Sequence, residues 1–388
     1  MTELGADWRV LDGVTTAWFE APSLIEGASL AARAVELSAG IAVDVRATGV
    51  RVRLDANEHA ATVSSSARTL GLVANPAVLQ QMSVVIESAN PTEVGGFWQR
   101  VFDYVPADGG LVDPLRRDPA FRLRQSAAVP PLRNRIHLDV VRPAAAVEQV
   151  GLGEAFGPYD VCHADPNGNE VDVVPADPLG ETADTADWHA VFSAVACYRT
   201  TSPAQQRDLA AAAAALADEA GFPLMIDLRP GLVIFDSGKD QWEAEAHGLD
   251  VAFTDLARRI QAAARESGAV ADDGLPRFAQ LFIDAADVDA VREFWVEALG
   301  YVRDRRDGCT DIVDPRRLNP VLLFQELDAT DTARRQQRNR IHFELAVPAD
   351  QAPARVATML AAGGHLLDES AGHWLIADPE GNELAITT

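Results

Sequence analysis

The pentapeptide Arg-Asn-Arg-Ile-His occurs twice in this chain, at residues 133–137 and 338–342. Each copy is followed by the hexapeptide Asp-Pro-x-Gly-Asn-Glu, at residues 165–170 and 378–383. Two motifs that recur in the same order are the signature of an internal duplication. The chain is therefore predicted to contain two copies of one composite unit, which we call repeat one and repeat two.

The duplication extends toward the N-terminus of each copy. Asp7-Trp8 recurs as Asp187-Trp188, and Val-Asp-Val-Arg at residues 43–46 is echoed by Ile-Asp-Leu-Arg at residues 226–229. The segment that follows Pro175 has the composition of a linker, so repeat one ends there and repeat two begins near Asp187.

Each repeat changes character once along its length. A chain of 388 residues is too long for one ordinary core. In the second part of each repeat an apolar, strand-like run leads into an amphipathic helix, at residues 82–102 and 279–299. Four domains are therefore predicted, at residues 1–79, 80–176, 187–273 and 274–388.

The second part of each repeat has an α+β pattern. Strand and helix are followed by a second strand, at residues 136–141 and 341–347, and the Asp-Pro-x-Gly tetrapeptides then have the residue types of hairpin turns. This order predicts two modules per repeat. We expect the two modules of one repeat to pair into a single curved sheet with helices on its outer face.

Composition excludes several classes of partner. The net charge of −25 and the pI near 4.6 disfavour nucleic acids and anionic membranes, and no run of about 20 apolar residues is present. The N-terminus lacks a signal-peptide pattern, and three widely spaced cysteines (Cys162, Cys197 and Cys309) fit no disulfide framework. We expect a cytoplasmic protein with a small-molecule ligand, and homo-oligomerisation stays open.

Alternation along the strand after each pentapeptide separates polar from apolar side chains. Arg135, His137 and Asp139 point to one face, and the intervening apolar residues point to the other. Repeat two places Arg340, His342 and Glu344 in the same way. We expect the polar rows to line a concave face, with Ile136 and Ile341 toward the helices.

An arginine, a histidine and a carboxylate in one row can bind a carbonyl or anionic group and move a proton. His137, Asp139, His342 and Glu344 are the catalytic candidates, and the two arginines are candidates for substrate binding. The alternative is a satisfied polar network that holds the sheet in register. No phosphate loop, dinucleotide fingerprint or nucleophile elbow occurs.

The pentapeptides, the Phe-Trp pair in each helix and the closing Asp-Pro-x-Gly-Asn-Glu strands resemble the glyoxalase/bleomycin-resistance/extradiol-dioxygenase superfamily, also called the vicinal oxygen chelate superfamily. The resemblance covers about residues 80–175 and 274–388, and it implies a tandem duplication with glyoxalase-like domains of paired βαβββ modules. Isomerases, lyases, dioxygenases and metal-free binding proteins share this fold, so it does not identify a reaction.

The first part of each repeat resembles, more faintly, the α+β fold of pterin-4a-carbinolamine dehydratase. That family uses a His-His-Pro segment ahead of a strand. The matching places here read Gly-Ile-Ala at residues 40–42 and Gly-Phe-Pro at residues 221–223, without histidine. The resemblance therefore implies degenerate domains that serve as a scaffold, a dimer surface or a wall of the ligand site.

Metal-using members of the superfamily take ligands from the first and last strands of each module. In repeat one the matching places are Ser83, Gln125, His137 and Asp172, and in repeat two they are Gln280, Gln325, His342 and Ala385. His137 and Asp172 are strong donors in repeat one, whereas repeat two offers His342 alone. No cofactor is favoured, and a divalent metal held by His137 and Asp172 stays an alternative.

The leading hypothesis is a metal-independent enzyme of small-molecule or secondary metabolism that performs isomerisation, elimination or cyclisation. Gln125, Gln280, Gln325 and the helix tryptophans Trp98 and Trp295 are further candidates for ligand binding. Two rivals remain: a ligand-sequestering protein of the bleomycin-resistance type, and a metal-dependent lyase or dioxygenase that uses repeat one.

Overall fold

The computed structural model describes residues 4–127, 130–243 and 253–388. The chain divides into two compact bodies. The helix-backed body comprises residues 1–79, 142–146 and 175–278, and the paired-sheet body comprises residues 80–141, 147–174 and 279–388. Each is described by itself. In the described ranges no helix has both the length and the apolarity to cross a bilayer.

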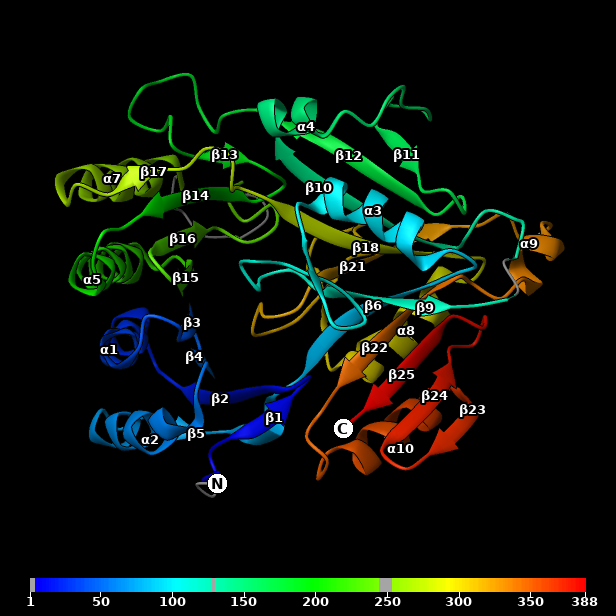
Figure 1. Ribbon diagram of the computed structural model, residues 1–388, viewed down its shortest axis with the longest axis horizontal. Helices are drawn as coiled ribbons and strands as arrows, with labels where there is room; N and C mark the ends of the chain where they lie inside the picture. The colour runs from blue at the N-terminus through cyan, green and yellow to red at the C-terminus, as the bar shows by residue number, and fades with distance from the viewer. Residues whose placement is uncertain (1–3, 128–129, 244–252) are drawn as a thin grey trace. The chain divides into compact units, whose positions relative to one another are not determined.

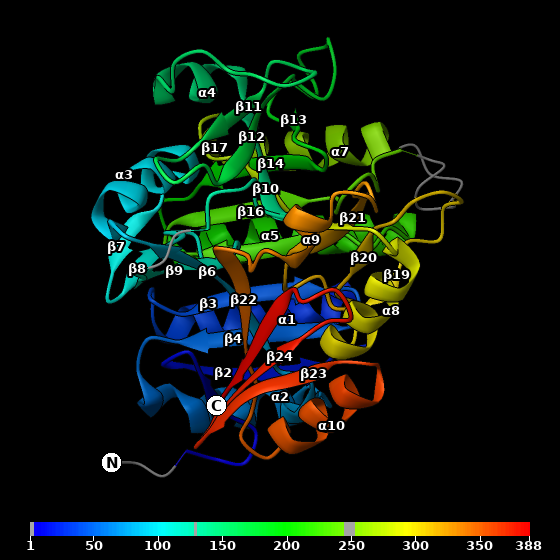
Figure 2. The same cartoon turned by 90° about the vertical axis from the view of Figure 1, so that its right-hand side faces the viewer.

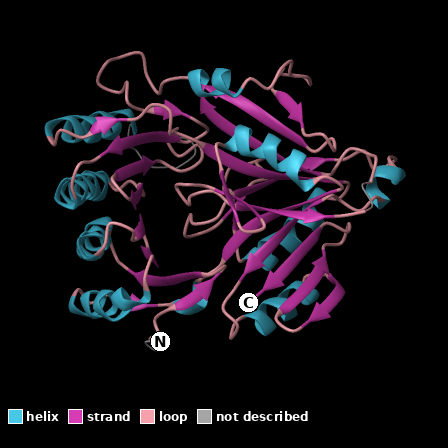
Figure 3. Ribbon diagram, in the orientation of Figure 1, coloured by secondary structure: helices cyan, strands magenta, loops and turns pink. Residues whose placement is uncertain are grey.

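The helix-backed body contains one sheet with the strand order β1-β2-β4-β3-β15-β16-β14-β13, to which β5 and β17 add by pairing with β2 and β14. Its strands are β1 (Arg9–Leu11), β2 (Val14–Glu20), β3 (Ala42–Arg46), β4 (Gly49–Leu54), β5 (Val73–Ala74), β13 (His189–Ala190), β14 (Ala194–Arg199), β15 (Met225–Arg229), β16 (Leu232–Asp236) and β17 (Val270–Ala271). Its helices are α1 (Leu24–Leu37), α2 (Ala60–Thr69), α5 (Pro203–Ala220) and α7 (Phe253–Glu266), with the short 3₁₀ turns η1 (Asn57–His59) and η2 (Pro76–Val78). Figure 3 shows the four helices in a row on one face of the sheet.

Both repeats contribute to this sheet. Strands β3 and β15 are antiparallel neighbours, and their register places Asp44 opposite Asp227. These strands are the segments that echo one another in sequence. The first part of each repeat thus has the α+β character predicted, and both parts lie in one body. Their resemblance to the pterin dehydratase fold stays a prediction.

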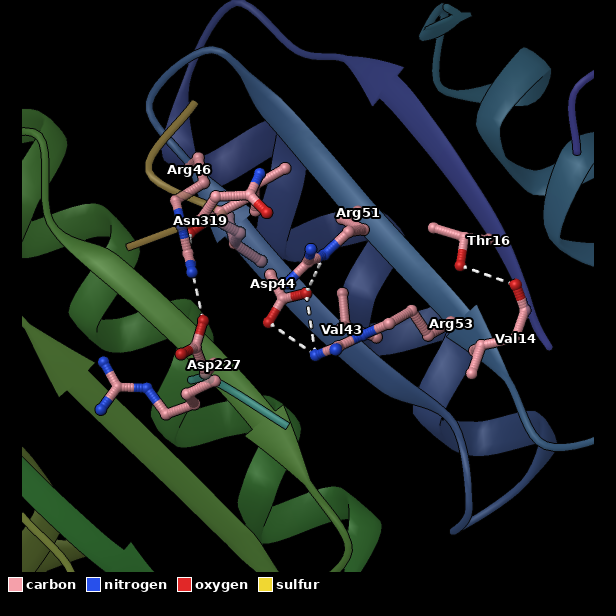
Figure 4. A network of polar contacts seen from close by, with 12 residues as sticks. Val14, Thr16, Val43, Asp44, Arg46, Arg51, Arg53, Asp227 and Asn319 are labelled. Atoms are coloured by element: carbon pink, nitrogen blue, oxygen red, sulfur yellow. Dashed lines mark hydrogen bonds and ion pairs between the residues drawn. The ribbon is translucent and has the colours of Figure 1, made fainter. Parts of the chain in front are cut away.

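Buried ion pairs join the two repeats on the helix-free face of this sheet (Figure 4). Arg46 of repeat one pairs with Asp227 of repeat two at 2.6 Å, and Arg229 of repeat two pairs with Asp44 of repeat one. Arg51 also donates to Asp44, at 2.6 Å. Burial opposes ionisation of Asp44, but the surrounding guanidinium groups outweigh burial and hold its pKa well below the ordinary value. Removal of one partner would leave a buried charge uncompensated.

The paired-sheet body contains two sheets with one module of each repeat in each sheet. The eight-stranded sheet has the order β23-β24-β25-β22-β6-β9-β8-β7, and the seven-stranded sheet has the order β11-β12-β10-β18-β21-β20-β19. The strands of repeat one are β6 (Gln81–Ser88), β7 (Val105–Ala107), β8 (Gly110–Val112), β9 (Ala120–Gln125), β10 (Ile136–Pro143), β11 (Cys162–Ala164) and β12 (Glu170–Ala176). The strands of repeat two are β18 (Phe278–Ala285), β19 (Val302–Arg303), β20 (Ile312–Val313), β21 (Val321–Glu326), β22 (Ile341–Ala346), β23 (His365–Ser370), β24 (His373–Ala377) and β25 (Glu383–Thr387). The helices are α3 (Pro91–Phe102), α4 (Ala144–Val150), α8 (Val288–Leu299), α9 (Thr332–Gln336) and α10 (Ala352–Ala361).

The expectation that the two modules of one repeat share a sheet is wrong. In the eight-stranded sheet β6 of repeat one pairs antiparallel with β22 of repeat two (Figures 1 and 2). In the seven-stranded sheet β10 of repeat one lies beside β18 of repeat two. The chain therefore crosses between sheets after β9 and again after β21. The first strand of a module can pair with the corresponding strand of the module in the same repeat or in the other repeat. Strand periodicity is the same in both copies, so it does not specify which of the two becomes the partner.

The two pentapeptides meet where the chain crosses. Asn134 accepts a hydrogen bond from the backbone amide of Arg340 at 3.0 Å, and Asn339 accepts one from the amide of Arg135 at 3.1 Å. Leu132 and Gln337 exchange a further pair, of 2.8 and 3.0 Å. Because every bond joins one repeat to the other, this reciprocal set specifies the crossed pairing.

The second arginine of each pentapeptide clamps the hairpin turn of the other repeat. Arg135 donates to the carbonyl of Glu380 at 2.7 Å, and Arg340 donates to the carbonyl of Gly168 at 3.1 Å and to the side chain of Asn169 at 2.9 Å. Both guanidinium groups are buried. The prediction that these arginines bind substrate is not supported, since both are buried and their guanidinium groups bind the turns of the crossed modules.

The apolar faces of both sheets pack against helices as predicted. Ile136 and Ile341 belong to a core that includes the aromatic residues of α3 and α8. The polar residues that alternate with the apolar ones along β10 and β22 therefore point to the opposite, helix-free faces of the two sheets. His137 and His342 lie on these faces. The predicted facing of these strands is confirmed, although the partner strand is not the one expected.

Crossed pairing can be tested with engineered cysteines. Glu344 on β22 lies opposite Ser83 on β6, and such antiparallel neighbours lie about 4.5–5.5 Å apart, within disulfide range. We expect Ser83→Cys with Glu344→Cys to form a disulfide that peptide mapping detects. The matched control is Ser83→Cys with Asp139→Cys, the pair that uncrossed modules would bring together. A disulfide in the control pair alone would contradict the crossed topology.

Candidate active site

A cavity of about 380 Å³ opens on the helix-free face of the seven-stranded sheet. Its lining residues are Arg133, His137, Phe156, Gly157, Pro158, Tyr159, Val161, Cys162, Glu170, Asp172 and Gln325. A volume in this range suits a small organic ligand. Gln325 comes from repeat two and the other lining residues from repeat one, so the cavity depends on the crossed pairing.

His137 lies on β10 at the base of this cavity. Its ring stacks on Phe282 of β18, with centroids 4.7 Å apart and planes 11° from parallel. Burial lowers the pKa of His137 to about 3, assisted by the positive charges of Arg133 and Arg334. The imidazole is therefore neutral at physiological pH, and a neutral imidazole can accept a proton.

Asp284 on β18 lies behind His137. Its carboxylate is 3.8 Å from Nδ1 of His137, a buried nitrogen that has no hydrogen-bond partner. Burial raises the pKa of Asp284, while the guanidinium of Arg334, which donates to it, acts in the opposite direction. Sequence reasoning missed Asp284, although Glu87 occupies the same position of β6 in repeat one.

Asp172 and Cys162 are paired neighbours on β12 and β11. The Cys162 thiol donates a hydrogen bond to the Asp172 carboxylate. Burial raises the pKa of Asp172, and burial together with this carboxylate raises the pKa of Cys162 to about 12. The thiol is therefore protonated and a poor nucleophile, and Asp172 retains a proton to higher pH than an exposed aspartate does.

The other two candidates on this sheet contact each other. Gln280 of β18 donates to the Asp139 carboxylate at 2.9 Å, and both side chains are buried. Neither is among the residues that line the cavity. The structure therefore places Asp139 and Gln280 beside the site rather than inside it.

The eight-stranded sheet carries a related but different arrangement. His342 lies 3.7 Å from Glu87, which Arg338 binds through two hydrogen bonds of 2.7 Å. Arg124 donates to Glu344 at 2.9 Å. Burial lowers the pKa of His342 to about 4, although the nearby Glu87 charge opposes this shift. Here salt bridges occupy the face on which the seven-stranded sheet holds its cavity.

The predicted equivalence of Gln125 and Gln325 is wrong by one residue. Strand register places Gln325 beside Asp284, and it places Arg124, not Gln125, beside Glu87. A shift of one residue turns a side chain to the other face. Gln125 accordingly donates to the backbone carbonyl of Ala89 instead of facing His342.

The helix tryptophans do not line a cavity. The indole of Trp98 donates to Asp165 at 2.9 Å, and that of Trp295 donates to Asp378 at 3.0 Å. Both rings are fully buried between helix and sheet. The prediction that they contact ligand is wrong, because the apolar stripe of each helix faces the core. They instead anchor the aspartate that opens each hairpin turn.

The donor set around His137 does not fit a firmly held transition metal. Of the strong donor types that line the cavity, Arg133 binds Glu170 and the Cys162 thiol stays protonated, which leaves His137 and Asp172. Gln325 offers a weak amide oxygen, and the Gln280 amide is bonded to Asp139. Arg133 adds positive charge to the same cavity. Within the described ranges, His, Cys and carboxylate groups close enough to share an ion occur together at Asp304, Cys309 and Asp311, where Arg306 already binds Asp304.

A family model described as the glyoxalase-like domain matches residues 83–174 and 280–387, more than half of the chain. The chain belongs to the glyoxalase-like domain family. Apart from residues 142–146, both matched segments lie in the paired-sheet body, and each spans two modules of its repeat. Three of the four modules have the order βαβββ, whereas the second module of repeat one has two described strands after its helix. The resemblance noted from the sequence motifs is therefore confirmed.

The glyoxalase-like chain is also similar to solved structures. Glyoxalase I from Zea mays matches with 10% identity and a TM-score of 0.38, over 80% of this chain and 92% of that chain. A candidate dioxygenase from Bacillus subtilis matches with 10% identity and a TM-score of 0.39, over 79% of this chain and 84% of that chain. No curated protein sequence matches the chain significantly.

The two buried histidines predict a specific loss of stability in acid. Their pKa values are about 3 for His137 and about 4 for His342, against 6.5 for an ordinary histidine. The unfolded chain therefore binds more protons below about pH 6.5, and the unfolding free energy falls as the pH falls. At about pH 5 each histidine should lower the unfolding free energy by roughly 2 kcal/mol relative to neutral pH.

Denaturant unfolding at about pH 5 and about pH 7.5 measures this loss. The double variant His137→Gln with His342→Gln should show a smaller difference between the two pH values than the unchanged chain does. An exposed histidine, His365, gives the matched control variant, His365→Gln. An equal pH dependence in the double variant would show that these side chains are not buried and neutral.

Proposed function

We propose that this glyoxalase-like chain is an enzyme that moves protons on a small molecule bound in the cavity of the seven-stranded sheet, without a metal ion. The observation that carries the proposal is the convergence of His137, Asp172 and Gln325 on one cavity. A neutral imidazole can act as a general base, and a carboxyl group with a raised pKa can act as a general acid.

His137 is the proposed base. Its Nδ1 lies 3.8 Å from the Asp284 carboxylate. We propose that Nδ1 carries the ring proton, which leaves the lone pair of Nε2 for the substrate. Phe282 supports the ring by stacking. Asp284 is a positioning residue, since it acts through the imidazole and does not line the cavity.

Asp172 and Gln325 are the proposed partners of a carbonyl oxygen. His137 removes a proton from the carbon beside the carbonyl, and the electron pair moves onto the carbonyl oxygen. Hydrogen bonds from the Asp172 carboxyl and the Gln325 amide stabilise the charge on that oxygen. Return of the proton to a different carbon completes an isomerisation, and departure of a leaving group from the neighbouring carbon completes an elimination.

A sequestering protein is the second candidate, and the exposed aromatic residues Phe156 and Tyr159 at the cavity mouth favour it. Such a protein needs apolar contact with its ligand but no titratable group beside it. The two candidates therefore differ in what they require of His137, and this difference determines the test.

Replacement of the two histidines separates the candidates. In D₂O, an enzyme of the proposed kind should speed deuterium exchange at the carbon beside a carbonyl, which proton NMR follows. We expect His137→Asn to lower this rate by roughly 10² to 10⁴, with ligand affinity nearly unchanged. His342→Asn should lower it less than about tenfold, because Ala385 and Arg124 replace Asp172 and Gln325 in that sheet.

His342→Asn also serves as the matched control for the loss of a buried histidine, and the thermal midpoints of both variants identify any unfolding. Equal losses in both variants would contradict the proposed single working site. Binding without any exchange in the unchanged protein would instead identify a sequestering function.

Metal independence has its own test. Two strong donors beside an arginine should hold a transition metal weakly, so protein purified without chelator should carry far less than one metal ion per chain. Elemental analysis measures this, and the rate of deuterium exchange should not change on dialysis against chelator. One metal ion per chain that is lost in both His137→Asn and Asp172→Asn would show that the site is a metal centre.

A further inference from the structure

The mouth of the cavity carries two exposed aromatic side chains, on the segment between α4 and β11. Tyr159 is 83% exposed and Phe156 is 47% exposed, and both line the cavity. The other large hydrophobic residues that are exposed in the described part of the chain are all aliphatic. Apolar surface exposed at the rim of a cavity marks a place of contact with a ligand.

The backbone holds these rings over the cavity. Phe156 and Cys162 exchange two backbone hydrogen bonds, of 3.0 and 3.1 Å, and the Asp160 amide donates to the carbonyl of Gly157 at 3.3 Å. The intervening residues form a closed turn with Tyr159 near its tip. Gly157 has a φ of 86°, a conformation that favours glycine. A ring presented on a closed turn loses little conformational freedom when it binds a flat ligand.

This turn is specific to repeat one. In repeat two, β23 pairs with β24 from His365 to Ser370, whereas repeat one retains a single bridge between Phe156 and Cys162. An aromatic turn thus replaces a strand in the sheet that also carries Asp172. The aromatic turn and Asp172 therefore occur together at one cavity. Both are missing from the corresponding place in the described eight-stranded sheet.

The charges at the cavity are already paired. Arg133 binds Glu170 at 2.8 Å, and Asp284 is bound by Arg334. His137 is neutral, so the described lining residues offer no unpaired cation to an anionic ligand. Asp172 would repel an anion when it is ionised. An uncharged ligand therefore suits this lining best, with Gln325 and Asp172 available for its polar edge.

We infer that the cavity binds an uncharged, flat, conjugated ring compound that carries a carbonyl or hydroxyl oxygen at one edge. The ring lies against Tyr159 and Phe156, and the oxygen meets Gln325 and Asp172. The placement of a carbonyl beside His137 rests on the proposed function, whereas recognition of the ring depends only on the aromatic turn.

Two fused-ring ketones of similar size test the inference. β-Tetralone has one aromatic ring, and β-decalone is its saturated counterpart. Calorimetric titration of the whole chain should show β-tetralone binding about tenfold more tightly. Tyr159→Ala and Phe156→Leu should each remove most of that preference, whereas Tyr159→Phe should keep it. Val302→Ala, which shortens an exposed side chain on β19, is the matched control and should change nothing.

Equal binding of the two ketones, or a preference that persists in Tyr159→Ala, would overturn the inference. Tighter binding of a β-tetralone that carries a ring carboxylate would also overturn it, because the ligand would then be anionic.

His137→Asn should keep the preference for the aromatic ring. If the preference is found but no deuterium exchange occurs in the unchanged protein, the proposed function fails and the ligand class stands. If non-aromatic ketones undergo exchange and the preference for the aromatic ring is absent, the proposed function stands and the ligand class fails.

Discussion

The reciprocal hydrogen bonds between the two Arg-Asn-Arg-Ile-His segments determine the architecture of the paired-sheet body. Asn134 and Asn339 each bind the backbone of the other repeat, and the arginine that follows each asparagine clamps the opposite hairpin turn. A buried arginine with unpaired donors would be costly, so the clamps stabilise one pairing of modules and penalise the other. The pentapeptide thus recurs in both repeats for a structural reason, and in repeat one its first and last residues, Arg133 and His137, also line the cavity.

Crossed pairing allows two similar sheets to differ in function. Each sheet takes one module from each repeat, so a substitution in either repeat alters one sheet only. The helix-facing residues of both copies are apolar and form one core. The opposite faces differ, since Asp172 in the seven-stranded sheet corresponds to Ala385 in the eight-stranded sheet, and Gln325 corresponds to Arg124. One cavity can therefore retain chemistry while salt bridges occupy the other face.

Periodicity and turn residues predicted the strands, the helices and the facing of Ile136 and His137, because these depend on local sequence. They could not predict the partner of each strand, since both copies present the same edge. Without the strand partners, the sequence could not place Gln325 in the same cavity as His137. It also could not identify Asp284, which approaches His137 from the neighbouring strand. The misplacement of Gln125 had a smaller cause: an alignment by motif spacing carries an uncertainty of one residue, and one residue reverses the face of a strand.

The strongest physical constraint on the proposed chemistry is the low pKa of His137, about 3. A base this weak removes a proton from carbon slowly, so the proposed chemistry requires an imidazole that is more basic when ligand is bound. Asp284 is placed for this role, because it lies 3.8 Å from Nδ1 and Arg334 keeps it in position. Contraction of that gap to a hydrogen bond of roughly 2.8 Å would stabilise the imidazolium. An uncharged ligand favours this change, since it excludes water from the cavity without adding a charge that competes for Asp284. Under the proposed function, the carboxylate that would raise the basicity of His137 therefore comes from the other repeat.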